Sequence, residues 1–333
     1  MSTPHVLVVG AGSAGQRHAR NLAQLGCRIS AVDPREDRLA EISREVAVDT
    51  GHRHLPEALC NIDVGAVVIA SPTAFHVDQA LAALDADLPV LLEKPVATDA
   101  ASAQRLQAAV STSEAPLLLV YTWRWWPALR HVRALVEDGT VGEIRHVRCT
   151  MSAHLADWHP WEPYQEFFMS SRELGGGALL DESHWIDLAL WLFGMPQSVF
   201  ATIDRLSDLE IDADDNVDLL LDYGPIPRVW LHLDLHGRPH ERSLTISGAN
   251  GTIAWSAADN AVRVGRGEAD WAEEQFPGER NDMFVGVAEE FLEVIRGDRR
   301  PSCTVEDGLA VMEVIDAARH SATTRATTEV PLR

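Results

Sequence analysis

A glycine-rich turn between an apolar run and a helical stretch constrains the fold of this chain more than any other feature. Residues 5–9 read HVLVV, and GAGSAG follows directly, so Gly10, Gly12 and Gly15 form a G-x-G-x-x-G motif that opens a stretch of helical periodicity. Glycines at this spacing permit a tight turn and let a pyrophosphate approach the helix N-terminus, where the helix dipole favours negative charge. The motif therefore predicts a dinucleotide-binding domain.

Strand-like and helix-like segments continue to alternate as far as about Tyr121. Apolar strands are expected at 28–32, 64–70, 89–92 and 117–121, and helices at 38–46, 75–85 and 98–112. Strands that alternate with helices form a parallel, doubly wound sheet. We therefore assign 1–122 to an α/β domain of the Rossmann type.

The segments that follow predict a second domain over 123–333. Helices are expected at 127–138, 178–192, 281–296 and 304–319, a strand at 143–152, and short β segments from about 197 to 265 with a turn at Asn250-Gly251. This order is typical of an α+β domain with a mostly antiparallel, open sheet. The length of 333 residues also exceeds what a single core usually fills.

Charge and composition narrow the possible partners and compartment. Lys and Arg number 28 against 50 Asp and Glu, and the net charge of −22 argues against nucleic acid and anionic membranes as partners. No signal-type segment opens the chain and no run approaches the ~20 apolar residues of a membrane span, so we expect a cytoplasmic protein. The cysteines at 27, 60, 149 and 303 form no CxxC pair or Cys/His cluster, which predicts neither a disulfide framework nor a metal site.

Asp33 lies at the end of the second predicted strand. A carboxylate at this place accepts hydrogen bonds from the adenosine ribose of a dinucleotide and repels a 2′-phosphate, which favours NAD over NADP. Arg35 and Arg38 follow, and two interpretations of them stay open. They are either solvated side chains at a helix start or ligands of a 2′-phosphate.

Two further segments lie where parallel strands end, the edge at which ligands bind in open α/β sheets. Lys94 belongs to one of them and is the only lysine of the chain. Near a bound cofactor, a lysine could hydrogen-bond a substrate hydroxyl, and the alternative is a surface ion pair with the preceding glutamate. The two segments are Ser71-Pro72-Thr73 and Glu93-Lys94-Pro95.

A second group of candidate catalytic residues follows Gly175-Gly176-Gly177. If 178–192 is one helix, Asp181, His184 and Asp187 are successive i, i+3 neighbours on nearly one face. A carboxylate beside an imidazole can orient it as a general base that takes the proton of an alcohol. The alternative is a histidine that is hydrogen-bonded within the core.

Seven of the ten tryptophans lie between 123 and 191. Most of them are expected in the core or at a subunit interface, where large aromatic side chains are commonly buried. The exception is the segment Trp158-His159-Pro160-Trp161, which we place in a loop at the substrate pocket, because loops carry binding residues.

Together these motifs resemble the Gfo/Idh/MocA oxidoreductases, the group of glucose–fructose oxidoreductase and inositol dehydrogenase. The resemblance implies a first domain that binds NAD(P), a second domain whose open sheet forms the interface of dimers or tetramers, and reversible hydride transfer at a secondary alcohol of a sugar, cyclitol or related compound. It is carried by GAGSAGQRH (10–18), ASPTAFH (70–76), EKPVAT (93–98), YTWRWWP (121–127), VGEI (141–144) and GGGALLDESHWIDLALWLFG (175–194).

By this resemblance, Lys94 is the catalytic lysine, and Asp181 and His184 are the acid/base pair. In the commoner family pattern this His follows the Asp by four residues, whereas His184 follows Asp181 by three. One residue is therefore missing between them, before His184. The residues expected to bind the cofactor are Gly10, Ala11, Gly12, Ser13, Ala14, Gly15, Asp33, Arg38, Ser71, Pro72, Thr73, His76, Glu93 and Lys94. Those expected to contact the substrate are Arg124, Trp158, His159, Tyr164, Asp181 and His184.

Two alternatives to a dehydrogenase stay open. Some relatives keep NAD bound and use a transient oxidation to cleave a glycoside without net redox change. A few others are sensors that bind a dinucleotide and a partner protein but catalyse nothing. Intact Lys94, Asp181 and His184 argue against the sensor, which has no need of acid/base groups.

Overall fold

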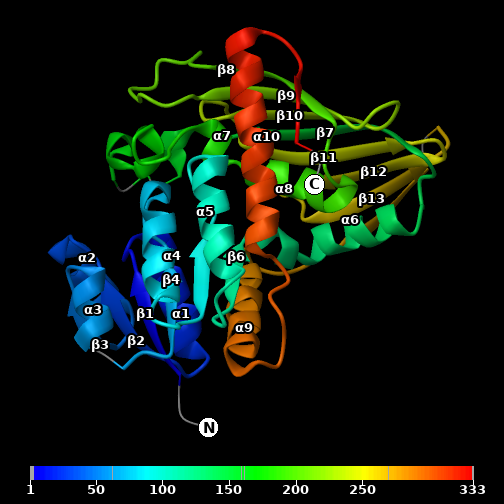
Figure 1. Ribbon diagram of the computed structural model, residues 1–333. Helices are drawn as coiled ribbons and strands as arrows, with labels where there is room; N and C mark the ends of the chain where they lie inside the picture. Colours follow the sequence, from blue (N-terminus) through cyan, green and yellow to red (C-terminus); the bar gives the residue numbers. More distant parts are fainter. Residues whose placement is uncertain (1–3, 62, 159, 161, 269, 332–333) are drawn as a thin grey trace. The chain divides into compact units, whose positions relative to one another are not determined.

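The computed structural model describes residues 4–61, 63–158, 160, 162–268 and 270–331. The chain forms two compact units (Figure 1): Met1–Thr122 with Arg280–Leu309, and Trp123–Glu279 with Ala310–Arg333. The chain thus passes between the units at three places, of which the sequence analysis placed only the one at 122/123.

A six-stranded parallel sheet in the order β3-β2-β1-β4-β5-β6 forms the centre of the first unit and confirms the doubly wound prediction. Its strands are β1 (His5–Val9), β2 (Arg28–Val32), β3 (Val48–His52), β4 (Ala66–Ile69), β5 (Val90–Glu93) and β6 (Leu117–Val120). Its helices are α1 (Ser13–Gln24), α2 (Glu36–Glu45), α3 (Leu55–Asn61), α4 (His76–Leu84), α5 (Ala100–Val110) and α9 (Asp282–Arg296).

Three of the four interior strands of this sheet, β1, β4 and β5, are buried along their whole length, as apolar runs in a parallel sheet with helices on both faces should be. β3 and α3 were not predicted from the sequence. β3 is an edge strand whose residues are exposed or partly exposed, so it lacks the apolar run by which the other strands were predicted.

Residues 280–309 complete the first unit. α9 packs against α1, and the Leu119 N–H donates to the carbonyl oxygen of Cys303 at 3.0 Å. Gly308 approaches β6 so closely that a Cβ there would lie 2.6 Å from the Leu119 side chain. A Cβ there would also lie 2.9 Å from the Cβ of Val96, so glycine fits best near the start of α10 (Val305–Thr324), the helix along which the chain leaves this unit.

A nine-stranded sheet in the order β14-β13-β12-β11-β7-β10-β9-β8-β15 forms the second unit. β7 pairs in parallel with β10 and the other neighbours pair antiparallel, which confirms the mostly antiparallel prediction. The strands are β7 (Ile144–Ser152), β8 (Ser198–Asp204), β9 (Asn216–Asp222), β10 (Arg228–Asp234), β11 (Glu241–Gly248), β12 (Gly251–Ser256), β13 (Ala261–Arg266), β14 (Asp270–Gln275) and β15 (Thr328–Glu329). The helices wholly in this unit are α6 (Pro127–Glu137), α7 (Ala178–Asp181) and α8 (His184–Phe193).

The two faces of the nine-stranded sheet differ. Leu231 and Leu233 of β10 are fully buried on the face against which α6 and α8 pack (Figure 1). On the opposite face, Phe200, Leu220 and Trp230 lie in register across β8, β9 and β10. Phe200 is 39% exposed and Trp230 is 50% exposed, so this face presents large apolar side chains to solvent.

The hairpin turn between β11 and β12 differs from the predicted one. The turn between β11 and β12 consists of Ala249 and Asn250, one residue earlier than predicted, because Gly248 pairs with Gly251. None of the helices in the described part of the chain combines the length and the apolar character that a membrane span needs.

Candidate functional site

The glycine turn joins β1 to α1, and its three glycines meet different surroundings. A Cβ on Gly15 would lie 1.8 Å from the Gly10 carbonyl oxygen, and Gly10 has a φ of +90° with the Ala70 backbone 2.6 Å from its own Cβ position. Gly12, by contrast, meets nothing within 4 Å among the described residues. Packing therefore requires glycine at 10 and 15, whereas Gly12 leaves the helix start open. Open space here fits the pyrophosphate of a dinucleotide, whose approach a side chain would block.

The first turn of α1 supplies hydrogen-bond donors at the same place. The N–H groups of Ser13, Ala14 and Gly15 have no acceptor within the helix, because the first turn of any α-helix lacks one. Such donors, together with the helix dipole, suit an anionic group. Their contact with a cofactor stays a prediction.

Asp33 ties the glycine turn to the end of β2. Its side chain is 8% exposed, with Oδ2 accepting from the Ala11 N–H at 2.8 Å and Oδ1 accepting from the Arg35 N–H at 2.9 Å. Arg38 has a carboxylate partner along its own helix, since its Nη1 lies 3.1 Å from Glu41. That contact favours the interpretation of Arg38 as a side chain at a helix start.

The segments after β4 and β5 are joined by His76. Its ring is 1% exposed, with Nδ1 2.8 Å from the Pro95 carbonyl oxygen and Nε2 2.9 Å from the Ser71 carbonyl oxygen. Burial lowers the pKa of His76, against the opposing effect of the two carbonyl groups. Pro72 and Thr73 begin the single turn that precedes α4. Both predicted ligand-binding segments therefore belong to one edge of the sheet, and the backbone already engages the ring nitrogens of His76.

Glu93 ends β5, directly before Lys94. Its side chain is largely buried, with Oε1 2.7 Å from Nε2 of His18, while Oε2 accepts from the Lys94 N–H at 3.2 Å. Burial opposes ionisation of this carboxyl, but the hydrogen bond from His18 and the charges of His18 and Lys94 hold the pKa of Glu93 below its ordinary value. Glu93 is thus a buried carboxylate with specific partners rather than one half of a surface ion pair.

In the second unit, the helix predicted over 178–192 is two helices. α7 ends at Asp181 and α8 begins at His184, with a turn of two residues between them. The predicted placement of Asp181 and His184 on one continuous helix face is therefore wrong. The backbone forms a tight turn here, in which the Ser183 N–H donates to the Leu180 carbonyl oxygen, three residues before it, at 3.3 Å.

Asp214, which the sequence analysis did not single out, holds the start of α7. Its Oδ2 accepts from the Leu179 N–H at 2.8 Å and its carbonyl oxygen accepts from the Ala178 N–H at 2.9 Å. Gly177 has a φ of +106°, and a Cβ on it would lie 2.5 Å from the Asp214 carboxylate. The glycine run thus permits the contact that places α7, and with it the buried Asp181.

His184 stacks on the ring of Trp123. The ring centroids are 5.1 Å apart and the planes differ by 7°. Trp185 meets the edge of Trp123 at 4.6 Å, and Trp255 lies beyond at 6.2 Å. These three tryptophans are buried, which confirms the expected core role for Trp123 and Trp185, while His184 is partly exposed. An imidazole held flat in this way could offer a ring nitrogen to a substrate hydroxyl.

Arg124 and Asp187 form a buried ion pair. The distance from Arg124 Nη2 to Asp187 Oδ1 is 2.6 Å, and Arg124 Nε lies 3.1 Å from Oδ2. The side chains are 8% and 1% exposed. The pair joins the segment before α6 to α8. The contact of Arg124 with a substrate stays a prediction.

The loop that was predicted to bind substrate is only partly described. His159 and Trp161 lie outside the described residues. The indole N–H of Trp158 is buried and has no acceptor among the described residues. The contact of Trp158 with a substrate stays a prediction. The Tyr164 hydroxyl oxygen accepts from the Glu210 N–H at 3.2 Å.

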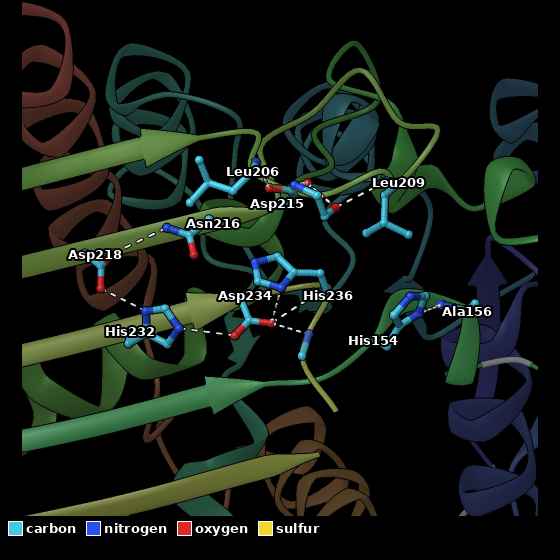
Figure 2. A network of polar contacts seen from close by, with 12 residues as sticks. His154, Ala156, Leu206, Leu209, Asp215, Asn216, Asp218, His232, Asp234 and His236 are labelled. Carbon is cyan, nitrogen blue, oxygen red and sulfur yellow. Dashed lines mark hydrogen bonds and ion pairs between the residues drawn. The ribbon is translucent and has the colours of Figure 1, made fainter. Parts of the chain in front are cut away.

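A network of carboxylates and histidines orders the start of β9 and the end of β10 (Figure 2). This network was not predicted from the sequence. His232 has Nδ1 2.8 Å from Asp218 Oδ1 and Nε2 3.2 Å from Asp234 Oδ2. Asp234 also accepts the N–H of His236 at 3.0 Å, and the fully buried Asp215 accepts the N–H of Leu206 at 2.7 Å. The sequence signal was the i, i+2 spacing of Asn216-x-Asp218 and His232-x-Asp234, which places such pairs on one strand face.

The position of His232 between two carboxylates predicts a stability that depends on pH. The hydrogen bonds with Asp234 and Asp218 raise the pKa of His232 to about 9. Because the folded pKa exceeds the ordinary value, the stabilisation is complete below about pH 6.5 and is lost as the pH rises through 9. His232→Gln should therefore lower the free energy of unfolding at pH 6 by only about 1 kcal/mol, since the ring is over a third exposed, and by nothing at pH 10.

Chemical denaturation of wild type and variant at both pH values measures this difference. His320→Gln, a change at an exposed histidine of α10, is the control and should leave both values unchanged. An equal loss for His232→Gln at pH 6 and pH 10 would contradict the role of the charged ring.

Two family models match the chain. The model of the oxidoreductase family NAD-binding Rossmann fold covers residues 5–121, and the model of the GFO/IDH/MocA C-terminal domain covers residues 129–254. This chain belongs to the Gfo/Idh/MocA oxidoreductase family. The resemblance seen in the motifs is thereby confirmed, and the first unit carries the NAD-binding domain of an oxidoreductase.

Curated relatives of this Gfo/Idh/MocA chain include several dehydrogenases. Levoglucosan dehydrogenase of Pseudarthrobacter phenanthrenivorans is 24% identical, with 99% of each chain covered. An inositol 2-dehydrogenase of Rhizobium meliloti is 26% identical over 94% of this chain and 95% of the relative. A D-xylose 1-dehydrogenase (NADP(+)) of Haloferax volcanii is 24% identical over 89% of both.

Solved structures share the same fold. Levoglucosan dehydrogenase in complex with NADH superimposes with a TM-score of 0.89 at 19% identity, covering 100% of both chains. The WlbA dehydrogenase of Bordetella pertussis, in complex with NADH and UDP-GlcNAcA, gives 0.83 at 23% identity, again over 100% of both chains. Both likenesses concern the fold.

Proposed function

We propose that this protein transfers a hydride between a secondary alcohol of a sugar, cyclitol or sugar derivative and the nicotinamide of NAD. The observation that carries the proposal is the glycine turn, where Gly12 leaves the start of α1 open and the buried Asp33 holds the Ala11 N–H. The named substrates of the relatives, levoglucosan, inositol and xylose, are all polyhydroxylated rings or sugars, which supports this substrate class.

The residues of the chain have distinct roles in this proposal. His184 takes the proton of the hydroxyl group as the C–H bond breaks, and Lys94 holds and polarises the same oxygen. Asp181 ends α7 three residues before His184 and, as the family resemblance implies, orients the imidazole. The chemistry supplied by bound NAD is acceptance of the hydride at nicotinamide C4, so that the alcohol becomes a ketone and the proton stays on the imidazole. The carboxylate of Asp33 favours NAD over NADP, because it repels a 2′-phosphate.

A substrate screen tests this function. The purified protein is incubated with sugars, cyclitols and glycosides, with NAD and with NADP, and reduced cofactor and released sugar are followed together. NADH formation with one polyol class supports the dehydrogenase. Sugar release without NADH, from protein that carries its own cofactor, would instead identify the glycosidase alternative. Tight NAD binding with neither product across the screen would favour the sensor.

We also propose that the protein is a homodimer or homotetramer that assembles through the open face of the nine-stranded sheet. Contiguous apolar side chains on an exposed face mark interaction surfaces, and Phe200, Leu220 and Trp230 form such a row. A sheet of nine strands is wide enough for the interface of a stable dimer, about 1,600 Å² in total.

Trp230→Glu should therefore dissociate the oligomer, because it puts a charge at the centre of the interface. Light scattering coupled to size exclusion measures the mass, which for one chain is 36.6 kDa. Leu206→Glu adds the same charge at an exposed apolar loop residue and should leave the assembly intact. A wild-type protein with the mass of one chain would rule out the proposed assembly.

A further inference from the structure

Buried histidines hold the residues on both sides of Lys94. Before it, Glu93 has Oε1 2.7 Å from Nε2 of His18, a fully buried side chain of α1. After it, the Pro95 carbonyl oxygen lies 2.8 Å from Nδ1 of His76, at the start of α4. The main chain at Lys94 is thus held by α1, which follows the glycine turn, and by α4, which follows the 71–73 segment.

The contact between His18 and Glu93 is specific to one ring nitrogen. Nδ1 of His18 is buried and has no hydrogen-bond partner among the described residues, so the side chain makes its hydrogen bond through Nε2. Nε2 must carry the proton, because an ionised carboxylate only accepts. A buried carboxyl group that lost this donor would shift toward its neutral form. His18 therefore keeps Glu93 ionised.

Glu93 acts on Lys94 in turn. Its Oε2 accepts from the main-chain N–H of Lys94 at 3.2 Å, and the charges of the two side chains interact. A carboxylate beside an ammonium group stabilises the charged form of that group and restricts its position. Because the hydrogen bond between His76 and Pro95 holds the chain after Lys94, loss of His18 should affect Lys94 chiefly through the Glu93 carboxylate.

We infer that His18 is a positioning residue for Lys94: its hydrogen bond holds the Glu93 carboxylate in place, and that carboxylate fixes the main chain of Lys94 at the end of β5 and interacts with the charge of its side chain. The part that Lys94 takes in the reaction rests on the proposed function. The coupling of His18, Glu93 and Lys94 does not, so it can be tested without any substrate.

The single lysine of the chain makes that test selective. Protein grown with ¹³C-labelled lysine contains one labelled side chain, that of Lys94. We expect its NMR resonance to titrate at lower pH in His18→Leu than in wild type, because the ammonium group loses its ionised partner. His18→Gln should restore the wild-type titration, since the amide nitrogen of glutamine is as many bonds from Cβ as Nε2 of histidine.

His52→Leu is the matched control. It makes the same substitution in β3, the edge strand separated from β5 by three other strands, and should leave the Lys94 titration unchanged. If His18→Leu does not fold, Glu93→Gln removes the charge at similar shape and should shift the titration in the same direction. An unchanged Lys94 titration in folded His18→Leu or in Glu93→Gln would overturn the inference, as would an equal shift in His52→Leu.

Activity provides a second, separate readout. With a substrate found in the screen, His18→Leu should lower kcat by about tenfold or more, because small displacements of a reacting group are costly. A shifted Lys94 titration in a protein that oxidises none of the tested alcohols would keep this inference and refute the proposed function.

Discussion

The turnover of His184→Ala should fall by roughly 10²–10⁴ relative to wild type, the usual contribution of a general base, while NAD affinity stays near the wild-type value. His184 begins α8, and its ring lies flat on Trp123, so its nitrogen atoms have a fixed direction. The predicted NAD-binding residues all belong to the first unit, whereas His184 belongs to the second. Steady-state kinetics and a separate NAD titration measure the two effects.

A second substitution distinguishes proton transfer from packing. His184→Phe keeps a flat ring that can stack on Trp123 but has no nitrogen to accept a proton. It should lose as much turnover as His184→Ala. Its thermal unfolding midpoint should lie closer to that of wild type than the midpoint of His184→Ala does. If His184→Phe retained wild-type turnover, His184 would have no part in proton transfer.

The Arg124→Met variant should be less stable than wild type by about 3–5 kcal/mol, because it leaves the Asp187 carboxylate buried without its counter-charge. Asp187 is 1% exposed and both of its oxygens lie within 3.2 Å of Arg124 nitrogens. Chemical denaturation followed by tryptophan fluorescence measures the loss, since Trp123 and Trp185 lie in the same unit.

The double variant Arg124→Met, Asp187→Leu is the control for this effect. Replacement of a buried ion pair by apolar side chains of similar volume is often neutral, so most of the stability should return. If Arg124 also contacts the substrate, KM for the substrate should rise in the double variant despite its restored stability. A single variant as stable as the double variant would show that the pair is not the source of the stability.

Local sequence patterns predicted the elements of both units well, because an apolar run or a helical period is contained within a few residues. β1, β4, β5 and β6 are buried strands of this kind, and G-x-G-x-x-G identified the turn before α1. Where the local signal was weak, as in the exposed edge strand β3, the element was missed. Across 178–192, local periodicity indicated one helix, but the structure has two, and Asp214 from a distant segment fixes the start of the first.

The same distinction between local and distant signals applies to the residues of the candidate site. Lys94 and His184 were identifiable because motifs within a few residues of them mark their positions, and the lone lysine singled out one of them. The partners that hold the site residues were not identifiable. His18 and Glu93 are separated by 75 residues and Arg124 and Asp187 by 63, and no periodicity connects residues so far apart.

By itself, then, the sequence determined the alternation of apolar strands and helices in the first domain, the glycine turn and the residue types available for acid/base chemistry, since these follow from local backbone preferences and side-chain spacing. The tertiary structure alone decided that 280–309 return to the first unit, that His232 lies between two carboxylates, and that buried partners fix Glu93 and Asp187. The physical reason is that burial and ion pairing depend on which surfaces meet when the chain packs, and the free energy of those contacts is absent from any short segment taken alone.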